Sequence, residues 1–243
     1  MPSPPPPAKK LRVLCLHGHR TNAAVMVNQT KGLRAALGDR AEFIYLDAPH
    51  LARGPTDPVI ELHHAKDAPF YEWWDSNPTD TTHQRENQWK LRLINHEETL
   101  AIMDKKLREL GPIDVVVGFS QGAVQLTTLS MIYLQKYNRR LWKLCICVGG
   151  VPPRGVQLRE VFETPDGRPI LVPYPSIHIV GEKDPVRHAS MRTIDMYDSH
   201  STMFPTSPLK KMVVFHHAGH KFPSANKYKA LYDELANVIV EHC

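Results

Sequence analysis

The chain has 243 residues, of which 42% are hydrophobic and 23% are charged. This length and composition predict one globular domain whose core needs neither disulfides nor a structural metal. They exclude a wholly disordered or fibrous protein. No apolar run in the sequence approaches the ~18 residues that a membrane-spanning helix needs.

The charge balance is mildly basic, with 30 Lys and Arg against 25 Asp and Glu and a net charge of +5. Such a balance can indicate a nucleic-acid or acidic-membrane partner. Here the basic residues are scattered along the chain, and aromatic residues do not alternate with them as a base-stacking groove requires. We therefore expect a small-molecule substrate, no nucleic acid and no membrane span, while the oligomeric state is not encoded in these patterns.

The four cysteines are Cys15, Cys145, Cys147 and Cys243, and their spacing matches no metal motif. Three of them lie in apolar runs, which predicts reduced core thiols and a cytoplasmic protein. The first residues are rich in proline and do not resemble a secretory signal. We expect a disordered tail over residues 1–10 and a single domain over residues 11–243.

Apolar strands alternate with helices along this domain. Strands are predicted at Leu11–Leu16, Glu42–Leu46, Asp114–Val117, Lys143–Val148, Ser176–Val180 and Met212–Phe215. Helices are predicted at Asn22–Leu37, Arg92–Leu110, Ala123–Tyr137, Pro185–Tyr197 and Asn226–Glu241. This alternation predicts an α/β fold with a mostly parallel central sheet and helices on both faces. Ligands of such sheets bind beyond the carboxyl ends of the strands.

Two segments interrupt the alternation. The stretch 50–88 is long, irregular and rich in Pro, His and Trp, and the stretch 149–172 is rich in Pro and Gly. Loops of this length in a compact domain are commonly binding loops or lids. We expect residues 50–88 to form a lid-like insertion.

The pentapeptide Gly118-Phe-Ser-Gln-Gly122 lies between a β-branched strand and an apolar helix. In that context Gly-x-Ser-x-Gly predicts a sharp turn that exposes a nucleophilic serine, here Ser120. The two glycines let the strand and the helix approach each other. The backbone N–H of Gln121 would then point at the negative charge that develops on an attacked carbonyl.

An acid and a histidine should follow later strands, because serine needs a base to take its proton. Asp184 follows the strand at 176–180, with Glu182 as a competing acid. His220 follows the last strand on an Ala-Gly turn, whereas its competitors His216 and His217 continue the strand. The three histidines could also bind a metal on spacing alone, but no helix aligns them, so we predict no metal.

A second donor to the attacked carbonyl should come from the loop after the first central strand. His17-Gly18-His19 fits, with the backbone N–H of His19 as the donor and Gly18 allowing the tight turn. Asn22 is expected to cap the next helix. In the long loop, Trp73 and Trp74 either line an acyl pocket or pack beneath the loop, and the sequence leaves both interpretations open.

The chain resembles the eukaryotic family of serine hydrolases (FSH) over nearly all of the sequence from Leu11 onward. The resemblance rests on Leu16-His-Gly18 with Asn22, Phe70-Tyr-x-Trp-Trp74, Val117-Gly-Phe-Ser-Gln-Gly122, Gly181-Glu-Lys-Asp184 and Gly219-His220. It implies an α/β-hydrolase fold, no cofactor, and esterase or thioesterase activity. It also implies a triad of Ser120, Asp184 and His220, with oxyanion donors at His19 and Gln121. His19 departs from the family, whose members often carry an apolar residue there.

The main hypothesis is a serine hydrolase that cleaves carboxylic esters or acyl thioesters through an acyl-enzyme on Ser120. If Phe70, Trp73 and Trp74 bind the substrate, its acyl group should be of medium or long length. The alternative is a hydrolase-like binding or scaffold protein without catalysis. A fluorophosphonate probe separates the two, since only an activated serine reacts with it.

Overall fold

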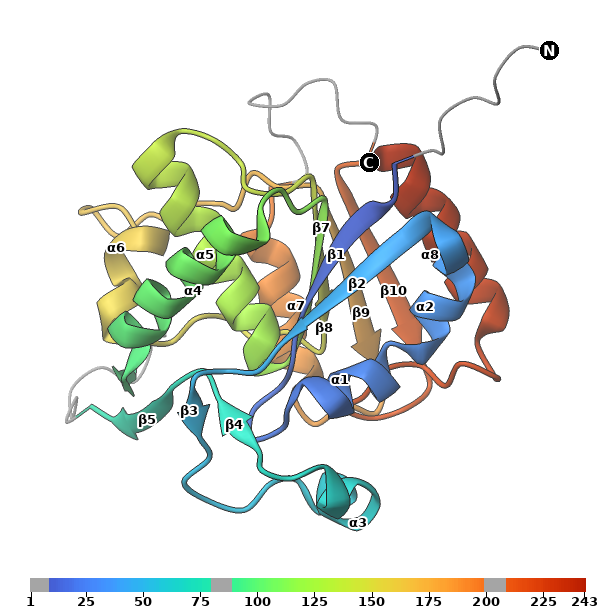
Figure 1. Cartoon of the computed structure of the whole chain (residues 1–243). Helices are drawn as coiled ribbons and strands as arrows, with labels where there is room; N and C mark the ends of the chain where they lie inside the picture. The colour runs from blue at the N-terminus through green and yellow to red at the C-terminus, as the bar shows by residue number, and fades with distance from the viewer. Residues whose placement is uncertain (1–8, 80–88, 199–208) are drawn as a thin grey trace.

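The computed structural model describes residues 9–79, 89–198 and 209–243, so most of the predicted proline-rich tail lies outside the described residues. The strands are β1 Leu11–Leu16, β2 Ala41–Leu46, β3 His50–Leu51, β4 Tyr71–Glu72, β5 Asp75–Pro78, β6 Leu91–Ile94, β7 Val115–Phe119, β8 Leu144–Val148, β9 Ser176–Gly181 and β10 Lys211–His216 (Figure 1). The α-helices are α1 Ala23–Gln29, α2 Lys31–Leu37, α3 Pro58–His64, α4 His96–Leu110, α5 Gln121–Tyr137, α6 Arg159–Phe162, α7 Arg187–Met196 and α8 Lys229–His242. Short 3₁₀ turns occupy Gly38–Arg40, Ala65–Asp67 and Val156–Leu158.

Within the described residues, the main sheet has six strands in the order β10-β9-β8-β7-β1-β2, and all its neighbouring strands are parallel. This confirms the predicted α/β architecture. The chain progresses from β1 to β2 in one direction and from β7 to β10 in the other, so the order reverses between β1 and β7. Such a switch point separates the loops after the two strands and forms the usual ligand crevice of an α/β sheet.

The two faces of the sheet carry two separate hydrophobic clusters, as the alternation of side chains along a strand requires. On β1, Leu14 and Leu16 belong to one cluster, while Val13 and Cys15 belong to the other. The first cluster also contains residues of α4, α5 and α6 and all four tryptophans. The second contains residues of α1, α2 and α8. Figure 1 shows these two sets of helices on opposite sides of the sheet.

The predicted helix over residues 22–37 is divided into α1 and α2 at Thr30. The Thr30 hydroxyl bonds the Met26 carbonyl at 2.8 Å and the Tyr45 hydroxyl at 2.7 Å, which attaches this point of the chain to β2. A side-chain hydroxyl that competes for helix carbonyls favours such a break. The two predicted ends are confirmed, because Asn22 caps α1 through Val25 N–H and Gly38 follows α2 with φ 52°.

The predicted helix at Arg92–Leu110 begins too early. Residues 91–94 form β6, which pairs with β5, and α4 starts only at His96. Leu91 and Leu93 alternate with a more exposed residue, which is strand periodicity, and Asn95 then adopts a left-handed conformation with φ 63°. The helical spacing holds only from α4 onward.

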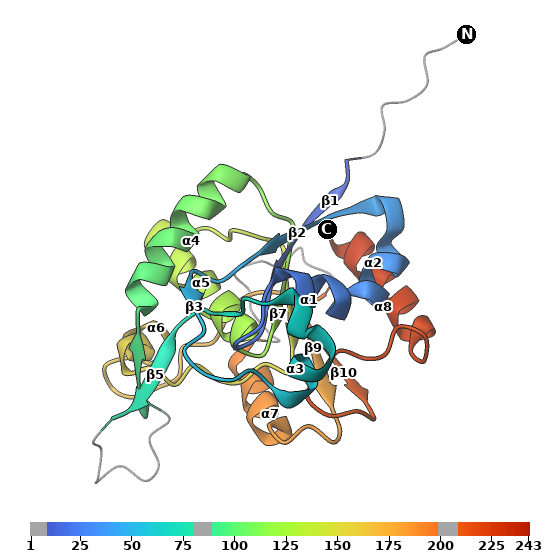
Figure 2. The ribbon, with the colours of Figure 1, turned by 60° about the horizontal axis from the view of Figure 1, so that its bottom comes forward.

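The segment expected to be irregular over residues 50–88 contains β3, α3, β4 and β5, and residues 80–88 lie outside the described ranges. β3 pairs with β4, so the chain folds back on itself around α3. Figures 1 and 2 show this part beyond the carboxyl ends of the central strands. Its function as a lid remains a prediction. No helix in the described part of the chain has the length and apolar character to cross a membrane.

Candidate active site

Ser120 lies in a strained turn between β7 and α5. Its backbone has φ 51° and ψ −115°, in the region that non-glycine residues avoid. A Cβ on Gly118 would lie 2.5 Å from the Gly122 carbonyl oxygen, and a Cβ on Gly122 would lie 2.1 Å from the Leu16 carbonyl oxygen. Both positions therefore require glycine, as the motif predicts. The turn is held by a hydrogen bond from Ser120 N–H to the Val148 carbonyl at 3.0 Å.

Asp184 and His220 form a hydrogen-bonded pair at the carboxyl ends of β9 and β10. The Asp184 Oδ2 atom lies 2.7 Å from His220 Nδ1. The Asp184 side chain is 1% exposed and the His220 side chain is 31% exposed. The second Asp184 oxygen accepts a hydrogen bond from Val186 N–H at 2.8 Å, which restricts rotation of the carboxylate. One imidazole nitrogen is thus occupied by the acid and the other is left for a partner.

Two contacts that the sequence did not identify determine where the His220 ring lies. The Phe119 ring, which belongs to the residue before Ser120, packs 4.9 Å from the His220 ring centre. Gly149 follows β8 with φ 55°, and a Cβ there would lie 2.8 Å from His220 Cε1. The close approach therefore requires glycine. The Gly149-Gly150 pair after a strand was the available signal, since consecutive glycines at a strand end indicate close packing.

The competing candidates lie in other environments. Glu182 forms an ion pair with His217, and these side chains are 40% and 72% exposed. His216 is buried, and burial lowers its pKa. His216, His217 and His220 therefore have different surroundings, and no group of three His, Cys, Asp or Glu side chains in the described ranges could hold a metal ion.

His17 is a buried, neutral structural residue. Its Nε2 accepts a hydrogen bond from Ala48 N–H at 2.9 Å, which leaves the proton on Nδ1 to donate to the Gly18 carbonyl at 2.8 Å. Burial lowers the pKa of His17 to about 4. A Cβ on Gly18 would lie 2.8 Å from the Phe119 ring, so the loop after β1 packs closely against the Ser120 turn.

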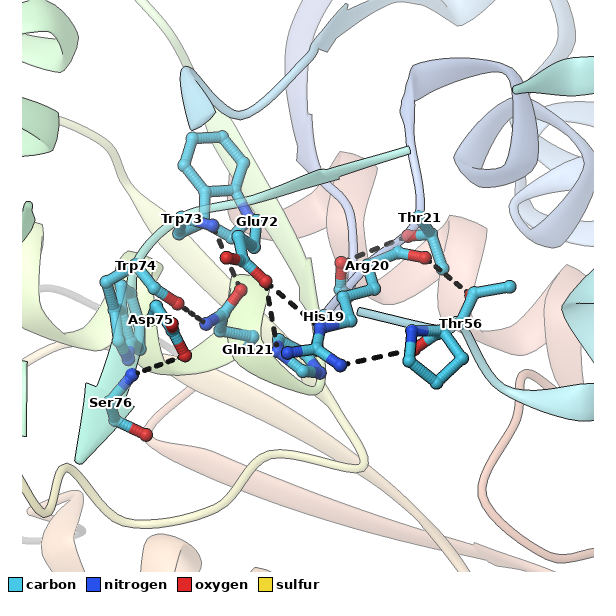
Figure 3. Close-up of polar contacts among 12 residues, drawn as sticks. His19, Arg20, Thr21, Thr56, Glu72, Trp73, Trp74, Asp75, Ser76 and Gln121 are labelled. Carbon is cyan, nitrogen blue, oxygen red and sulfur yellow. Dashed lines mark hydrogen bonds and ion pairs between the residues drawn. The ribbon is translucent and has the colours of Figure 1, made fainter. Parts of the chain in front are cut away.

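The Gln121 side chain binds the backbone of the two tryptophans. Its Oε1 accepts from Trp73 N–H at 3.0 Å, and its Nε2 donates to the Trp74 carbonyl at 2.8 Å (Figure 3). Both indole rings belong to the core cluster, and Trp73 Nε1 donates to the His17 carbonyl at 2.8 Å. Packing is therefore the observed role of both tryptophans, and Phe70 is half-buried beside them in the chain. Their contact with substrate remains a prediction.

His19 extends its side chain away from the protein core. The imidazole is 47% exposed, and its Nε2 lies 3.5 Å from the Glu72 carboxylate. Burial and the neighbouring Arg20 lower the pKa of His19, while Glu72 and Asp75 oppose this shift. The structure thus brings two sequence-predicted segments, the loop with His19 after β1 and the turn with Ser120 and Gln121 after β7, to the switch point between these strands.

Comparison with known families identifies the chain. The model of the family described as "Serine hydrolase (FSH1)" matches residues 7–232. The chain belongs to the FSH1 serine hydrolase family. This confirms the resemblance inferred from the motifs.

Relatives of this FSH1 family member include proteins named "Esterase OVCA2". The one from Homo sapiens is 30% identical over 240 residues, covering 96% of this chain and 98% of the relative. The one from Xenopus tropicalis is 29% identical over 226 residues, covering 93% and 91% of the two chains. The similarity therefore covers more than nine-tenths of this chain and of each relative.

Solved structures with a similar fold include esterase PE8, with a TM-score of 0.60 and 19% identity over 97% of this chain and 94% of that one. The Bacillus cereus carboxylesterase has a TM-score of 0.52 and 15% identity, covering 93% and 88% of the two chains. At these identities the likeness concerns the fold alone. This FSH1 family member has the α/β-hydrolase fold.

Proposed function

We propose that this protein is a serine esterase in which Ser120, His220 and Asp184 act as a catalytic triad. The observation that carries the proposal is the hydrogen bond between the buried Asp184 carboxylate and His220. The His220 ring packs against the ring of Phe119, the residue before Ser120 in the strained turn. Family membership independently supports a serine-based hydrolase. No cofactor is needed for this chemistry.

In the proposed reaction the Ser120 hydroxyl attacks the acyl carbon while His220 Nε2 takes the hydroxyl proton. Asp184 stabilises the imidazolium that results, because its carboxylate accepts from Nδ1. The backbone N–H groups of His19 and Gln121 stabilise the oxyanion. His220 then gives its proton to the leaving alcohol or thiol, which leaves the acyl group on Ser120. Water reverses these steps and releases the carboxylic acid.

The test of the nucleophile is the Ser120→Ala variant, assayed with p-nitrophenyl butyrate and labelled with a fluorophosphonate probe. We expect turnover to fall at least a thousandfold and the labelled peptide of the wild type to contain Ser120. The matched control is Ser190→Ala, which removes a serine hydroxyl elsewhere in the fold. Ser190 is buried, and its hydroxyl finds no hydrogen-bond partner among the described residues. Undiminished turnover by the Ser120→Ala protein would contradict the proposal. Absence of labelling in a folded wild type would favour the alternative of a binding or scaffold protein.

We propose acyl substrates of medium or long chain, either oxygen esters or thioesters. The aromatic segment from Phe70 to Trp74 is bound to the nucleophile turn through Gln121, which supports an apolar acyl site near Ser120. A series of p-nitrophenyl esters from acetate to octanoate measures the chain-length preference, and octanoyl-CoA against p-nitrophenyl octanoate measures the preference for sulfur or oxygen. A clear preference for acetate would contradict the proposed acyl site.

We also propose a cytoplasmic location. All four cysteines are free and three are buried, which fits a reducing compartment. Imaging of the full chain fused to a fluorescent protein tests this, and enrichment in the secretory pathway would contradict it.

A further inference from the structure

A buried carboxylate lies directly beside the loop that follows β1. Glu72, on β4, has a side chain that is only 1% exposed. Its Oε2 lies 3.1 Å from Arg20 Nε and 3.5 Å from His19 Nε2. The dashed lines in Figure 3 connect the carboxylate to both side chains. A charge buried to this degree is destabilising unless it is paired, so the contact with Arg20 is required by the fold.

Arg20 has an unfavourable backbone conformation that its contacts stabilise. Its φ is 52°, in the left-handed region that favours glycine. The Arg20 carbonyl accepts from the Thr56 hydroxyl at 2.5 Å, and Nη1 donates to the Pro55 carbonyl at 3.3 Å. Together with the Glu72 contact, these bonds hold both the backbone and the guanidinium. An unfavourable backbone conformation of this kind persists only where several surrounding contacts stabilise it.

The chain on both sides of Glu72 binds the same loop. Tyr71 N–H donates to the Thr21 carbonyl at 2.7 Å, and Trp73 Nε1 donates to the His17 carbonyl at 2.8 Å. Three consecutive residues, Tyr71 to Trp73, thus contact the loop at its end, its middle and its start. Glu72 is the middle contact, and His19 is the loop residue at that point.

We propose that Glu72 is a positioning residue that directs the His19 backbone N–H toward the oxyanion. The carboxylate holds the Arg20 guanidinium, and Arg20 in turn maintains the left-handed turn directly after His19, which fixes the course of the loop that carries the His19 N–H. This inference rests on the proposed function, in which that N–H donates to the oxyanion. Arg20 has a second effect: it neutralises a carboxylate that would otherwise oppose the negative charge of the transition state.

The test compares Glu72→Gln and the double variant Arg20→Gln/Glu72→Gln with the wild type. Displacing one oxyanion donor without deleting it should lower kcat by about tenfold, because removing such a donor lowers it by about a hundredfold or more. KM should change by less than about twofold, since the ground state gains little from this donor. The double variant contains no unpaired buried charge. It therefore tests the role of the Glu72 carboxylate even if Glu72→Gln does not fold.

The second measurement is the inhibition constant of an alkyl trifluoromethyl ketone, whose adduct with Ser120 places an oxyanion in the same position. We expect this constant to rise by about tenfold in both variants, in step with the loss of kcat/KM. The control variant is Glu163→Gln, because Glu163 also holds an arginine and an indole N–H, at 2.6 Å and 2.8 Å, in a different loop. It should lower neither kcat nor inhibitor affinity.

Two outcomes distinguish the possible failures. Variants with wild-type kcat and inhibitor affinity but a lower Tm would show that Glu72 is only structural, which overturns the inference and leaves the Ser120 proposal intact. Undiminished turnover by Ser120→Ala would overturn the proposed function and this inference with it.

Discussion

Two carboxylate–imidazole pairs join the turn after β9 to the turn after β10, and they lie in opposite environments. Asp184 and His220 are joined by a 2.7 Å hydrogen bond in which the carboxylate is buried. Glu182 and His217 form their pair at the surface. An exposed ion pair is weakened by water and salt, whereas a buried carboxylate holds an imidazole in one orientation and one tautomer. The difference teaches that burial, rather than residue type or spacing, separates a candidate triad from a surface ion pair.

The largest expected effect is that of Asp184→Asn. The amide cannot stabilise the imidazolium, so we expect kcat for p-nitrophenyl butyrate to fall by about a thousandfold or more. The matched change in the surface pair, Glu182→Gln, should alter kcat by less than about twofold because that pair is exposed. Equal losses of kcat in the two variants would contradict the distinction between the buried and the exposed pair. A larger loss of kcat in Glu182→Gln would reverse the assignment of the acid.

Gly149→Ala tests how closely the buried pair is packed. The new Cβ would lie 2.8 Å from His220 Cε1, so the imidazole must move and kcat should fall by about a hundredfold. Stability should also fall, because φ at this position is 55°.

The matched control is Gly167→Ala, where φ is 83° and no atom lies within 4 Å of the new Cβ. Strain alone should lower its stability by about 1 kcal/mol and leave kcat unchanged. Thermal unfolding and ester turnover of both variants separate strain from displacement of the ring. Unchanged turnover in Gly149→Ala would show that the close approach of residue 149 does not determine the position of the His220 ring.

The smallest expected effect is on the pH dependence of the unfolding free energy, to which buried and exposed histidines contribute differently. Burial lowers the pKa of His96 to about 4, and its Nε2 finds no hydrogen-bond partner in the described part of the chain. In the unfolded chain the pKa of the His96 side chain is near 6.5. As the pH falls, the unfolded state therefore binds this proton before the folded state does. The stability that neutral His96 contributes is present above about pH 6.5 and is lost as the pH falls toward 4. Burial also lowers the pKa of His17 to about 4 and that of His178 to about 3.

The variant His96→Phe keeps an aromatic ring against Trp74 and removes the titrating group. We expect its loss of unfolding free energy between pH 7 and pH 5, measured with urea, to be smaller than that of the wild type by about 1–2 kcal/mol. His217→Gln, at the surface, should lose as much as the wild type. An unchanged pH dependence in His96→Phe would show that this imidazole is not the source of acid sensitivity.

The strands and the Ser120 turn were predictable because their signals are local. Apolar runs bounded by turn residues indicated the six strands of the sheet, and Gly118 and Gly122 in the pentapeptide indicated the close strand–helix contact that the structure has. Helix boundaries were less accurate where a single side chain decides them, as the Thr30 hydroxyl does between α1 and α2.

The interactions between distant segments could not be read from the sequence. Glu72 is 52 residues from its partner Arg20, and nothing in its neighbourhood distinguishes it from a surface acid. The choice between Asp184 and Glu182 likewise depended on which carboxylate the packing buries. Gly181 lets the turn after β9 lie close to the turn after β10, since a Cβ there would lie 2.4 Å from the Gly219 carbonyl oxygen.

His220 follows β10, the end strand of the described sheet, whereas Ser120 follows β7 near its middle. An end strand has a neighbour on one side, and such elements open locally at a lower free energy than the whole fold. All four tryptophans belong to the cluster around α4, α5 and α6, which contains no residue of β10. Detachment of this edge would therefore separate His220, the proposed base, from Ser120, the proposed nucleophile, while indole fluorescence stays native. We expect loss of activity in mild denaturant to precede the optical unfolding transition.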